Sequence, residues 1–95
     1  MTDLRKLARG QPCRVRLPGV CANPDTVVLA HLKNGWYGSL KPPDIIGVHA
    51  CVGCHDAIDG RSHPKHLTRD EIDLAAYRGL CETLAYYASN DIVRW

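Results

Sequence analysis

The chain has 95 residues, with 12 Lys and Arg against 10 Asp and Glu, five Cys and no Phe. This length predicts a single domain over residues 1–95. Its hydrophobic core would be small, so the fold needs an additional source of stability. No apolar run approaches the roughly 20 residues that span a bilayer, and the polar residues 1–10 lack the apolar centre of a secretory signal. We therefore expect a cytoplasmic protein without a membrane partner, whose reduced cysteines bind metal.

Positive charge is concentrated near the start of the chain. Residues 1–16 carry five basic side chains against one acidic, whereas residues 67–95 carry three basic against five acidic. A basic segment favours contacts with phosphate, although an ordinary solvated surface would account for the same charges. Nucleic acid is thus an expected partner, and the candidate contacts are Arg5, Lys6, Arg9, Arg14, Arg16, Lys33 and Lys41.

The first third of the chain predicts short elements. Residues 4–8 favour one short helical turn, and residues 14–17 alternate polar and apolar side chains as a half-buried strand does. The sequence TVVLAHL at residues 26–32 is the clearest strand candidate, because β-branched and aliphatic residues favour strands.

The middle of the chain predicts a loop followed by a second strand. Residues 33–44 contain two Gly and two Pro, which favour a loop. This loop carries Trp36 and Tyr37, which either stack on nucleic-acid bases or pack over the cysteines. Residues 45–50 then form a second short apolar strand that leads into a pair of cysteines.

The second half predicts one short helix and one long helix. The short helix covers residues 52–59 and stops at Gly60. The long helix covers about residues 69–89, because Thr68 and Glu71 fit a capping box at its start. Apolar residues follow at spacings of three and four, as a packing stripe does: Ile72, Ala76, Leu80, Leu84 and Tyr87. The order of two strands, a helix and a supporting helix indicates an α+β fold.

Four of the five cysteines form two pairs that suit a metal. Cys13 and Cys21 flank a strand-turn segment, and Cys51 and Cys54 form a Cys-x-x-Cys pair. Zinc prefers four such ligands in a tetrahedron, and two close pairs provide them. A structural zinc ion would supply folding free energy that a small core lacks. Cys81, within the long helix, is predicted to be a small buried hydrophobic residue.

The cysteines allow two other interpretations. Cys51 to His55 reads Cys-x-x-Cys-His, the attachment pattern of c-type haem, but that chemistry requires export and leaves the first pair unexplained. A thioredoxin-like redox role is disfavoured because the pair does not open a helix within a βαβ unit. Zinc therefore remains the favoured interpretation.

Two histidines lie where they could take part in catalysis. His31 lies near the end of the predicted strand, and His55 directly follows the second cysteine of the Cys-x-x-Cys pair. Asp59 lies one helical turn beyond His55, so both side chains project from one face and could hold a divalent ion. The remaining histidines, His49, His63 and His66, are each more typical of surface groups than of ligands.

Several short motifs occur together over roughly residues 4–63. They are Leu-Arg-Lys-x-Ala-Arg-Gly, Cys-x-Val-Arg-x-Pro-Gly-Val-Cys, Leu-Ala-His, Lys-Pro-Pro-Asp and Ala-Cys-x-x-Cys-His-Asp-x-Ile-Asp. In this combination the chain resembles the YbcO-like nucleases of lambdoid phages and prophages, within the zinc-containing HNH (His-Me finger) endonucleases. The resemblance implies a zinc-stapled ββα-metal domain, treble-clef-like, with a core at about residues 11–63 and an added C-terminal helix.

The resemblance also implies an activity and a set of site residues. His31 would be the general base that takes a proton from water, and His55 would hold a catalytic divalent ion such as Mg²⁺ or Mn²⁺. Asp59, Asp56 or His63 could complete the ligands of that ion, and Arg61 could clamp the scissile phosphate. The implied reaction is hydrolysis of a phosphodiester bond, with DNA as the expected substrate. It would serve phage recombination, replication or packaging in the host cytoplasm, alongside phage proteins as possible partners.

Two positions depart from the HNH pattern. Ala30 stands where many HNH proteins place a metal ligand, and the middle Asn has no evident counterpart, with Asp44 as the nearest candidate and Asn34 behind it. These departures favour a second hypothesis, a non-catalytic zinc module that binds nucleic acid or a protein. In that case His31 is an ordinary strand-end residue, and His55 caps a helix or replaces a cysteine at the zinc.

Overall fold

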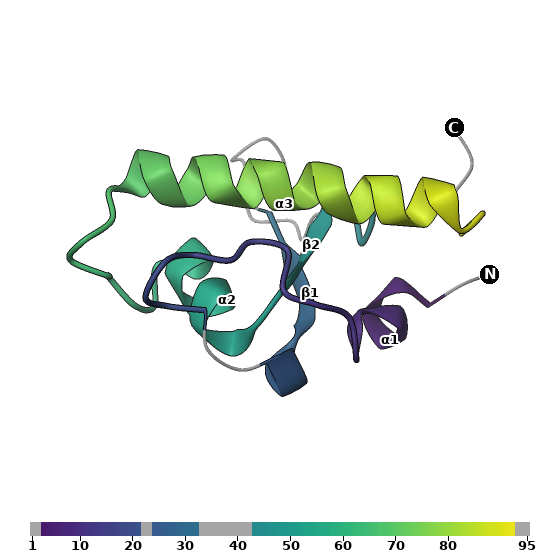
Figure 1. Ribbon diagram of the computed structural model, residues 1–95, viewed down its shortest axis with the longest axis horizontal. Coiled ribbons are helices and arrows are strands. Elements are labelled where there is room, and N and C mark those ends of the chain that lie inside the picture. The colour runs from purple at the N-terminus through teal and green to yellow at the C-terminus, as the bar shows by residue number, and fades with distance from the viewer. Residues whose placement is uncertain (1–2, 22–23, 33–42, 93–95) are drawn as a thin grey trace.

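The computed structural model describes residues 3–21, 24–32 and 43–92. Its elements in chain order are helix α1 (Leu4–Ala8), the 3-10 turn η1 (Pro24–Thr26), strands β1 (Val28–His31) and β2 (Gly47–Ala50), and helices α2 (Val52–Asp59) and α3 (Arg69–Ser89). Figure 1 shows α3 running the length of the molecule, with the strands beneath it and α2 and α1 toward opposite ends. The predicted α+β order is confirmed.

Strands β1 and β2 form a two-stranded antiparallel sheet. The register pairs Val28 with Ala50 at one end and His31 with Gly47 at the other. Each strand is shorter than predicted, because residues 24–26 form η1 and the residues before Gly47 form a turn. The sheet therefore places His31 at the last position of β1, as the sequence predicts.

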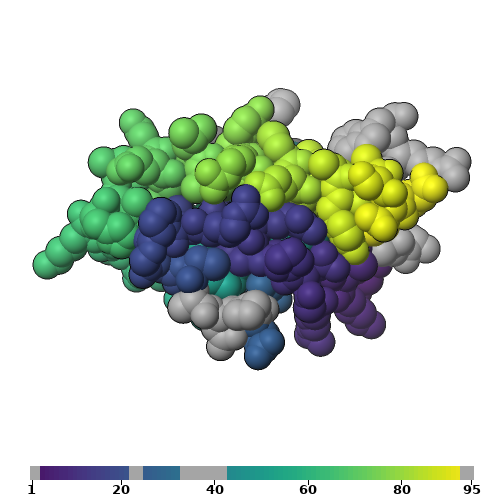
Figure 2. Space-filling view, in the orientation of Figure 1, coloured from purple at the N-terminus to yellow at the C-terminus, as the bar shows by residue number. Residues whose placement is uncertain are grey.

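The predicted strand over residues 14–17 is wrong. The apolar residues Val15 and Leu17 are buried, as the alternating pattern predicts, but the segment does not pair with a strand. The amide of Arg14 donates to the carbonyl of His49 at 2.8 Å, and Arg16, at φ 51°, then turns the chain away. The segment instead lies along α3 (Figure 2), where Arg78 donates to the carbonyl of Val15 at 2.9 Å.

Helix α3 begins with the predicted capping box, in which Thr68 and Glu71 each accept from the backbone amide of the other. The buried side of α3 differs in part from the predicted stripe. Leu80 and Leu84 are only half-buried, and the residue before each of them is buried instead. The buried positions are Ile72, Ala75, Ala76, Gly79, Thr83 and Tyr87. A Cβ at Gly79 would lie 2.8 Å from Val48 Cγ2 and 2.9 Å from the carbonyl oxygen of Arg14, so glycine allows this close approach. Cys81 is exposed, and its predicted burial is wrong.

Helix α2 covers the predicted residues and ends at Gly60, which adopts the left-handed conformation at φ 79°. Its last carbonyls are tied to α3, because the guanidinium of Arg69 donates to Ala57 and Ile58 at 2.9 and 2.8 Å. The core cluster joins the segment 13–17 to the strands, α2 and α3, and its members are Cys13, Val15, Leu17, Val27, Ala30, Val48, Ala50, Cys51, Cys54, Ala57, Ile72 and Ala75. In the part of the chain that the structure describes, no helix is both long and apolar enough to cross a membrane.

Candidate functional site

The four cysteines of the two predicted pairs lie together. The sulfur atoms of Cys13, Cys21, Cys51 and Cys54 are all within 4.8 Å of one another. Those of Cys51 and Cys21 are 3.8 Å apart, which is the separation of about 3.8 Å expected in a tetrahedron with Zn–S bonds of roughly 2.3 Å. The cluster is therefore of the right chemistry and size to hold a metal such as zinc.

Backbone geometry explains how the two pairs meet. The carbonyl of Leu17 accepts from the amides of Val20 and Cys21, at 3.1 and 3.0 Å, and closes a tight turn that carries Cys21. The first turn of α2 lies directly against this turn, because a Cβ at Gly53 would lie only 2.7 Å from the carbonyl oxygen of Val20. Glycine inside the Cys-x-x-Cys motif thus allows the turn and the helix to approach closely.

The electrostatics of the cluster favour a bound cation. The hydrogen bond from Cys54 lowers the pKa of Cys13 to about 4, and hydrogen bonds from the backbone amides of Arg16 and Cys51 also lower it. Burial, followed by the neighbouring thiols, raises the pKa of Cys21 to about 12. The bond to Cys13 and burial raise the pKa of Cys54 as well. Four adjacent thiols cannot all carry negative charge by themselves, and a dication at their centre would relieve this repulsion.

His31 is paired with Asp44, which lies in the turn just before β2. The Nε2 atom of His31 is 2.7 Å from Oδ1 of Asp44, and the same oxygen lies 3.4 Å from Nε of Arg5 on α1. The hydrogen bond from His31, aided by the charge of Arg5, lowers the pKa of Asp44. Because an ionised carboxylate only accepts hydrogen bonds, Nε2 of His31 carries the shared proton. This pair joins residues that are 13 positions apart.

His55 and Asp59 meet on α2 as their spacing predicts. Nε2 of His55 lies 3.2 Å from Oδ2 of Asp59, and the guanidinium of Arg61 lies 3.1 Å from the same oxygen. Arg61 also reaches Asp56 at 3.6 Å. His63 is exposed, and among the described residues it makes no hydrogen bond or ion pair with His55 or Asp59, so its role as a ligand stays a prediction.

The structure thus brings the predicted catalytic residues together as two groups, His31 with Asp44 and His55 with Asp59 and Arg61. No hydrogen bond or ion pair joins the two groups within residues 3–21, 24–32 and 43–92. Of these residues only Asp59 lines the cavity at the end of α2, which Leu32, the residue after His31, also lines.

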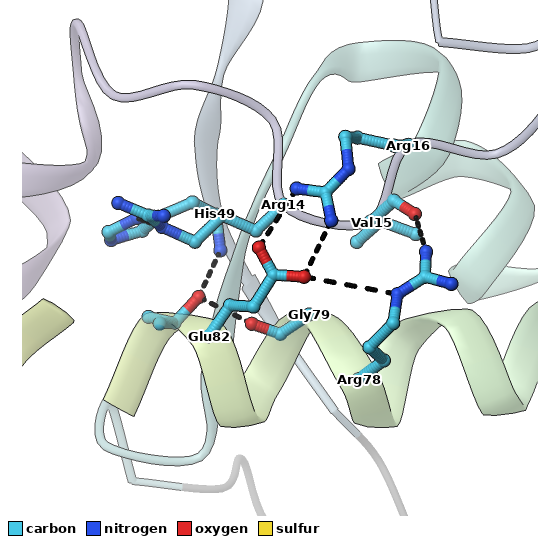
Figure 3. Close-up of polar contacts among 8 residues, drawn as sticks. Arg14, Val15, Arg16, His49, Arg78, Gly79 and Glu82 are labelled. Atoms are coloured by element: carbon cyan, nitrogen blue, oxygen red, sulfur yellow. Dashed lines mark hydrogen bonds and ion pairs between the residues drawn. The ribbon is translucent and has the colours of Figure 1, made fainter. Parts of the chain in front are cut away.

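The predicted nucleic-acid contacts have different surroundings. Lys6 and Arg9 are exposed on and after α1, and Arg5 contacts Asp44. Arg16 instead forms a two-bond pair with Glu82, at 2.9 and 2.6 Å (Figure 3). Arg14 is turned toward the interior. Lys33 and Lys41, like Trp36, Tyr37 and Asn34, lie outside the described residues.

Sequence reasoning missed a buried polar group around His49, whose predicted surface position is wrong. Nδ1 of His49 accepts from Nε of Arg14 at 3.2 Å, and Nε2 lies 3.2 Å from the hydroxyl of Tyr87. The His49 amide donates to the hydroxyl of Thr83 at 3.3 Å. Arg14 also lies 5.0 Å from the centre of the Tyr86 ring. The one sequence signal was Tyr87, a residue with a polar hydroxyl on the predicted stripe of the long helix.

The fold and the cysteine cluster define a small α+β protein with a site that could hold a metal such as zinc. The model of the family described as "Putative nuclease YbcO" matches residues 2–92, and the chain belongs to this family. Two relatives are each 58% identical over 66 residues, covering 66% of this chain and 69% of theirs. They are "Putative nuclease YbcO" of Escherichia coli K12 and "Putative nuclease ybcO" of Enterobacteria phage 82.

A solved structure is also similar to this chain. It is described as "Structure of a putative bacteriophage protein from Escherichia coli str. K-12 substr. MG1655", with a TM-score of 0.79 and 39% identity. The likeness covers 94% of this chain and 100% of the other. The arrangement of helices around the two strands is therefore shared with that solved protein.

Proposed function

We propose that this protein is an HNH-type endonuclease that hydrolyses phosphodiester bonds in nucleic acid, with DNA as its substrate. The observation that carries the proposal is the 2.7 Å pair of His31 and Asp44 at the end of β1. A histidine held by an ionised carboxylate is suited to general base catalysis, and the chain belongs to a family named for nuclease activity. The ββα-metal core would consist of β1, β2 and α2.

The cysteine cluster would have a structural role in this proposal. A zinc ion bound by Cys13, Cys21, Cys51 and Cys54 would fasten the N-terminal turn to the start of α2. That connection fixes the helix that carries His55 and Asp59. The closed set of four thiols, which leaves no ligand position for water, supports a structural ion over a catalytic one.

His31 would act as the general base. Asp44 accepts the hydrogen of Nε2, which leaves the lone pair on Nδ1 to take a proton from the attacking water. As the proton arrives, the carboxylate stabilises the positive charge that develops on the ring. Asp44 therefore supplies an orienting group close to the chain position where HNH proteins place their middle Asn.

His55 and Asp59 would hold the catalytic divalent ion, Mg²⁺ or Mn²⁺. The ring nitrogen and the carboxylate already lie 3.2 Å apart on one face of α2, and Asp59 is only 12% exposed. Such an ion would stabilise charge on the scissile phosphate and on the departing oxygen. Ala30 offers no ligand, so we assign His63 as the third protein ligand, which requires the turn after α2 to close.

Arg61 and the basic N-terminal side chains would bind the nucleic-acid backbone. Arg61 is 66% exposed and lies beside Asp59, so its planar guanidinium could reach a phosphate near the ion. Lys6 and Arg9 are exposed on and after α1, the helix whose Arg5 contacts Asp44. Such contacts position the substrate without reading its sequence. The phage relative supports a role in phage recombination, replication or packaging in the host cytoplasm.

Cleavage assays with matched variants test the proposal. Wild type, His31→Gln and His66→Gln would be incubated with plasmid and branched DNA in Mg²⁺ or Mn²⁺, after their zinc content is shown to be equal. Glutamine keeps a hydrogen-bond donor but cannot take a proton, so His31→Gln should lose nicking. His66, which contacts the carbonyl of Pro18, serves as the control and should leave nicking unchanged.

Two results would contradict the proposal. Equal cleavage by wild type and His31→Gln would remove His31 as the base. A wild type that cuts nothing with either ion but still binds nucleic acid or a protein would favour the non-catalytic zinc module instead. The ion pair between Arg61 and Asp59, which satisfies the carboxylate without a metal, is the contact that favours that second function.

A further inference from the structure

We propose that the cavity between α3, the end of α2 and the ends of the strands binds one unstacked nucleobase of the nucleic-acid substrate. The inference rests on the proposed nuclease function and adds the part of the substrate that the site recognises. The cavity has a volume of about 470 Å³, within the range of roughly 300–1,000 Å³ that is usual for small-molecule sites.

The walls of the cavity are largely apolar. Leu32 and Ile46 contribute from the ends of the strands, Ile58 from α2, and Leu80 from α3. Leu32 and Ile46 are joined by a backbone hydrogen bond of 3.0 Å, so this wall belongs to the sheet framework. A nucleobase has two flat apolar faces, and a site of this kind removes them from water.

Arg69 places a fixed planar cation in the lining of the cavity. All three nitrogens of its guanidinium are engaged, because they bond the carbonyls of Ala57 and Ile58 and the carboxylate of Asp73. Because these bonds occupy most of its edge, a ligand in the cavity would meet the flat face of the group. Guanidinium faces stack on nucleobases, whereas a phosphate would require the edge that is already occupied.

Tyr77 supplies an aromatic ring at the same cavity. Its exposed fraction is 63%, which is large for an aromatic residue on a helix that packs along the core. Aromatic rings that line nucleic-acid channels accept any base by stacking, because every base has a π face. An exposed tyrosine and a fixed guanidinium that line the same cavity therefore favour a planar ligand over a flexible apolar one.

Asp59 connects the cavity to the proposed reaction centre. It lines the cavity and also contacts His55, its proposed partner in holding the divalent ion. A base in the cavity would therefore belong to a nucleotide next to the scissile phosphate. Because a base inside a duplex has both faces stacked on its neighbours, the cavity selects single-stranded or branched nucleic acid over perfect duplex.

Binding measurements in the His31→Gln background separate this inference from catalysis. Fluorescence anisotropy would compare a labelled single-stranded oligonucleotide with the perfect duplex of the same sequence, as DNA and as RNA. Tyr77→Ala removes the ring, and Leu80→Trp fills the cavity. Ala85→Trp places the same bulk on the exposed side of α3 and is the matched control. Zinc content and circular dichroism would show that each variant is folded.

We expect the first two variants to weaken single-strand binding on the order of 10-fold, with duplex binding unchanged and the control unaffected. A 5-iodouracil base in the single strand should form a photochemical crosslink to Tyr77. Cleavage by wild type with equal single-strand binding in all variants would overturn the base site alone. Absence of binding to any nucleic acid would overturn both the base site and the nuclease proposal.

Discussion

Nε2 of His31, the last residue of β1, lies 2.7 Å from Oδ1 of Asp44 in the turn before β2. The contact orients the ring, since the carboxylate fixes which nitrogen carries hydrogen. It also links the sheet to α1, because Arg5 lies 3.4 Å from the same carboxylate oxygen. Asp44 is thereby held from two sides, by His31 on β1 and by Arg5 on α1.

This pair gives the first prediction, that Asp44→Asn slows cleavage on the order of 10- to 100-fold with little change in KM. The amide keeps the shape of the side chain but removes the negative charge that stabilises a protonated ring. Steady-state cleavage kinetics would measure the effect, with Asp70→Asn, an exposed acid at the start of α3, as the control. An unchanged kcat for Asp44→Asn would show that the carboxylate does not support the base.

Removing one ligand of the cysteine cluster should release the metal and destabilise the fold together. We expect Cys51→Ser to lower bound zinc from one ion per chain toward zero and to lower Tm by on the order of 10 °C. Metal analysis and thermal unfolding would be compared with Cys81→Ser, since Cys81 is exposed on α3 and outside the cluster. Full zinc content in Cys51→Ser would exclude Cys51 as a ligand.

The buried group at His49 predicts a cost for removing one hydroxyl. Tyr87→Phe leaves Nε2 of His49 without its partner at 3.2 Å in a fully buried position, so the free energy of unfolding should fall by about 1–3 kcal/mol. Tyr77→Phe makes the same chemical change at an exposed position of the same helix and should change stability by less than about 0.5 kcal/mol. Urea unfolding at neutral pH measures both, and equal losses would contradict the assigned contact.

The pair of Arg16 and Glu82 predicts a pH dependence (Figure 3). The hydrogen bond with Arg16 lowers the pKa of Glu82 below its ordinary value of 4.5. The carboxylate therefore stabilises the folded state fully above pH 4.5, and this contribution is lost as the pH falls through the lowered pKa. Because both side chains are partly exposed, we expect a coupling of only about 0.5–1 kcal/mol at pH 7.

A double-mutant cycle of Arg16→Gln and Glu82→Gln isolates that coupling from every other titrating group. Urea unfolding would be followed at pH 7 and at the lowest pH where the protein remains folded. The coupling should shrink toward zero at the acid end. A coupling that stays constant or grows there would show that charge on Glu82 is not its source.

Some of the structure follows from the sequence because its causes are local. The bounds of α2 and α3 depend on Gly60, on the capping box of Thr68 and Glu71, and on the end at Asn90, which all act within one helical turn. The cysteine cluster could be predicted because thiols in close pairs share one dominant chemistry. The family follows from motifs that occur together in the chain.

Tertiary structure alone decided the rest, because contacts between distant segments leave no periodic trace in the sequence. Residues 14–17 alternate polar and apolar side chains as a strand does, yet they pack against α3 and do not pair with a strand. The alternation therefore marks which side chains are buried and not a strand. Histidine is a polar residue that is typical of the surface. At His49, however, both ring nitrogens have hydrogen-bond partners, Arg14 and Tyr87, which are distant in the chain, and these contacts permit its burial. The pairing of His31 with Asp44 likewise exists only once the two strands have folded together.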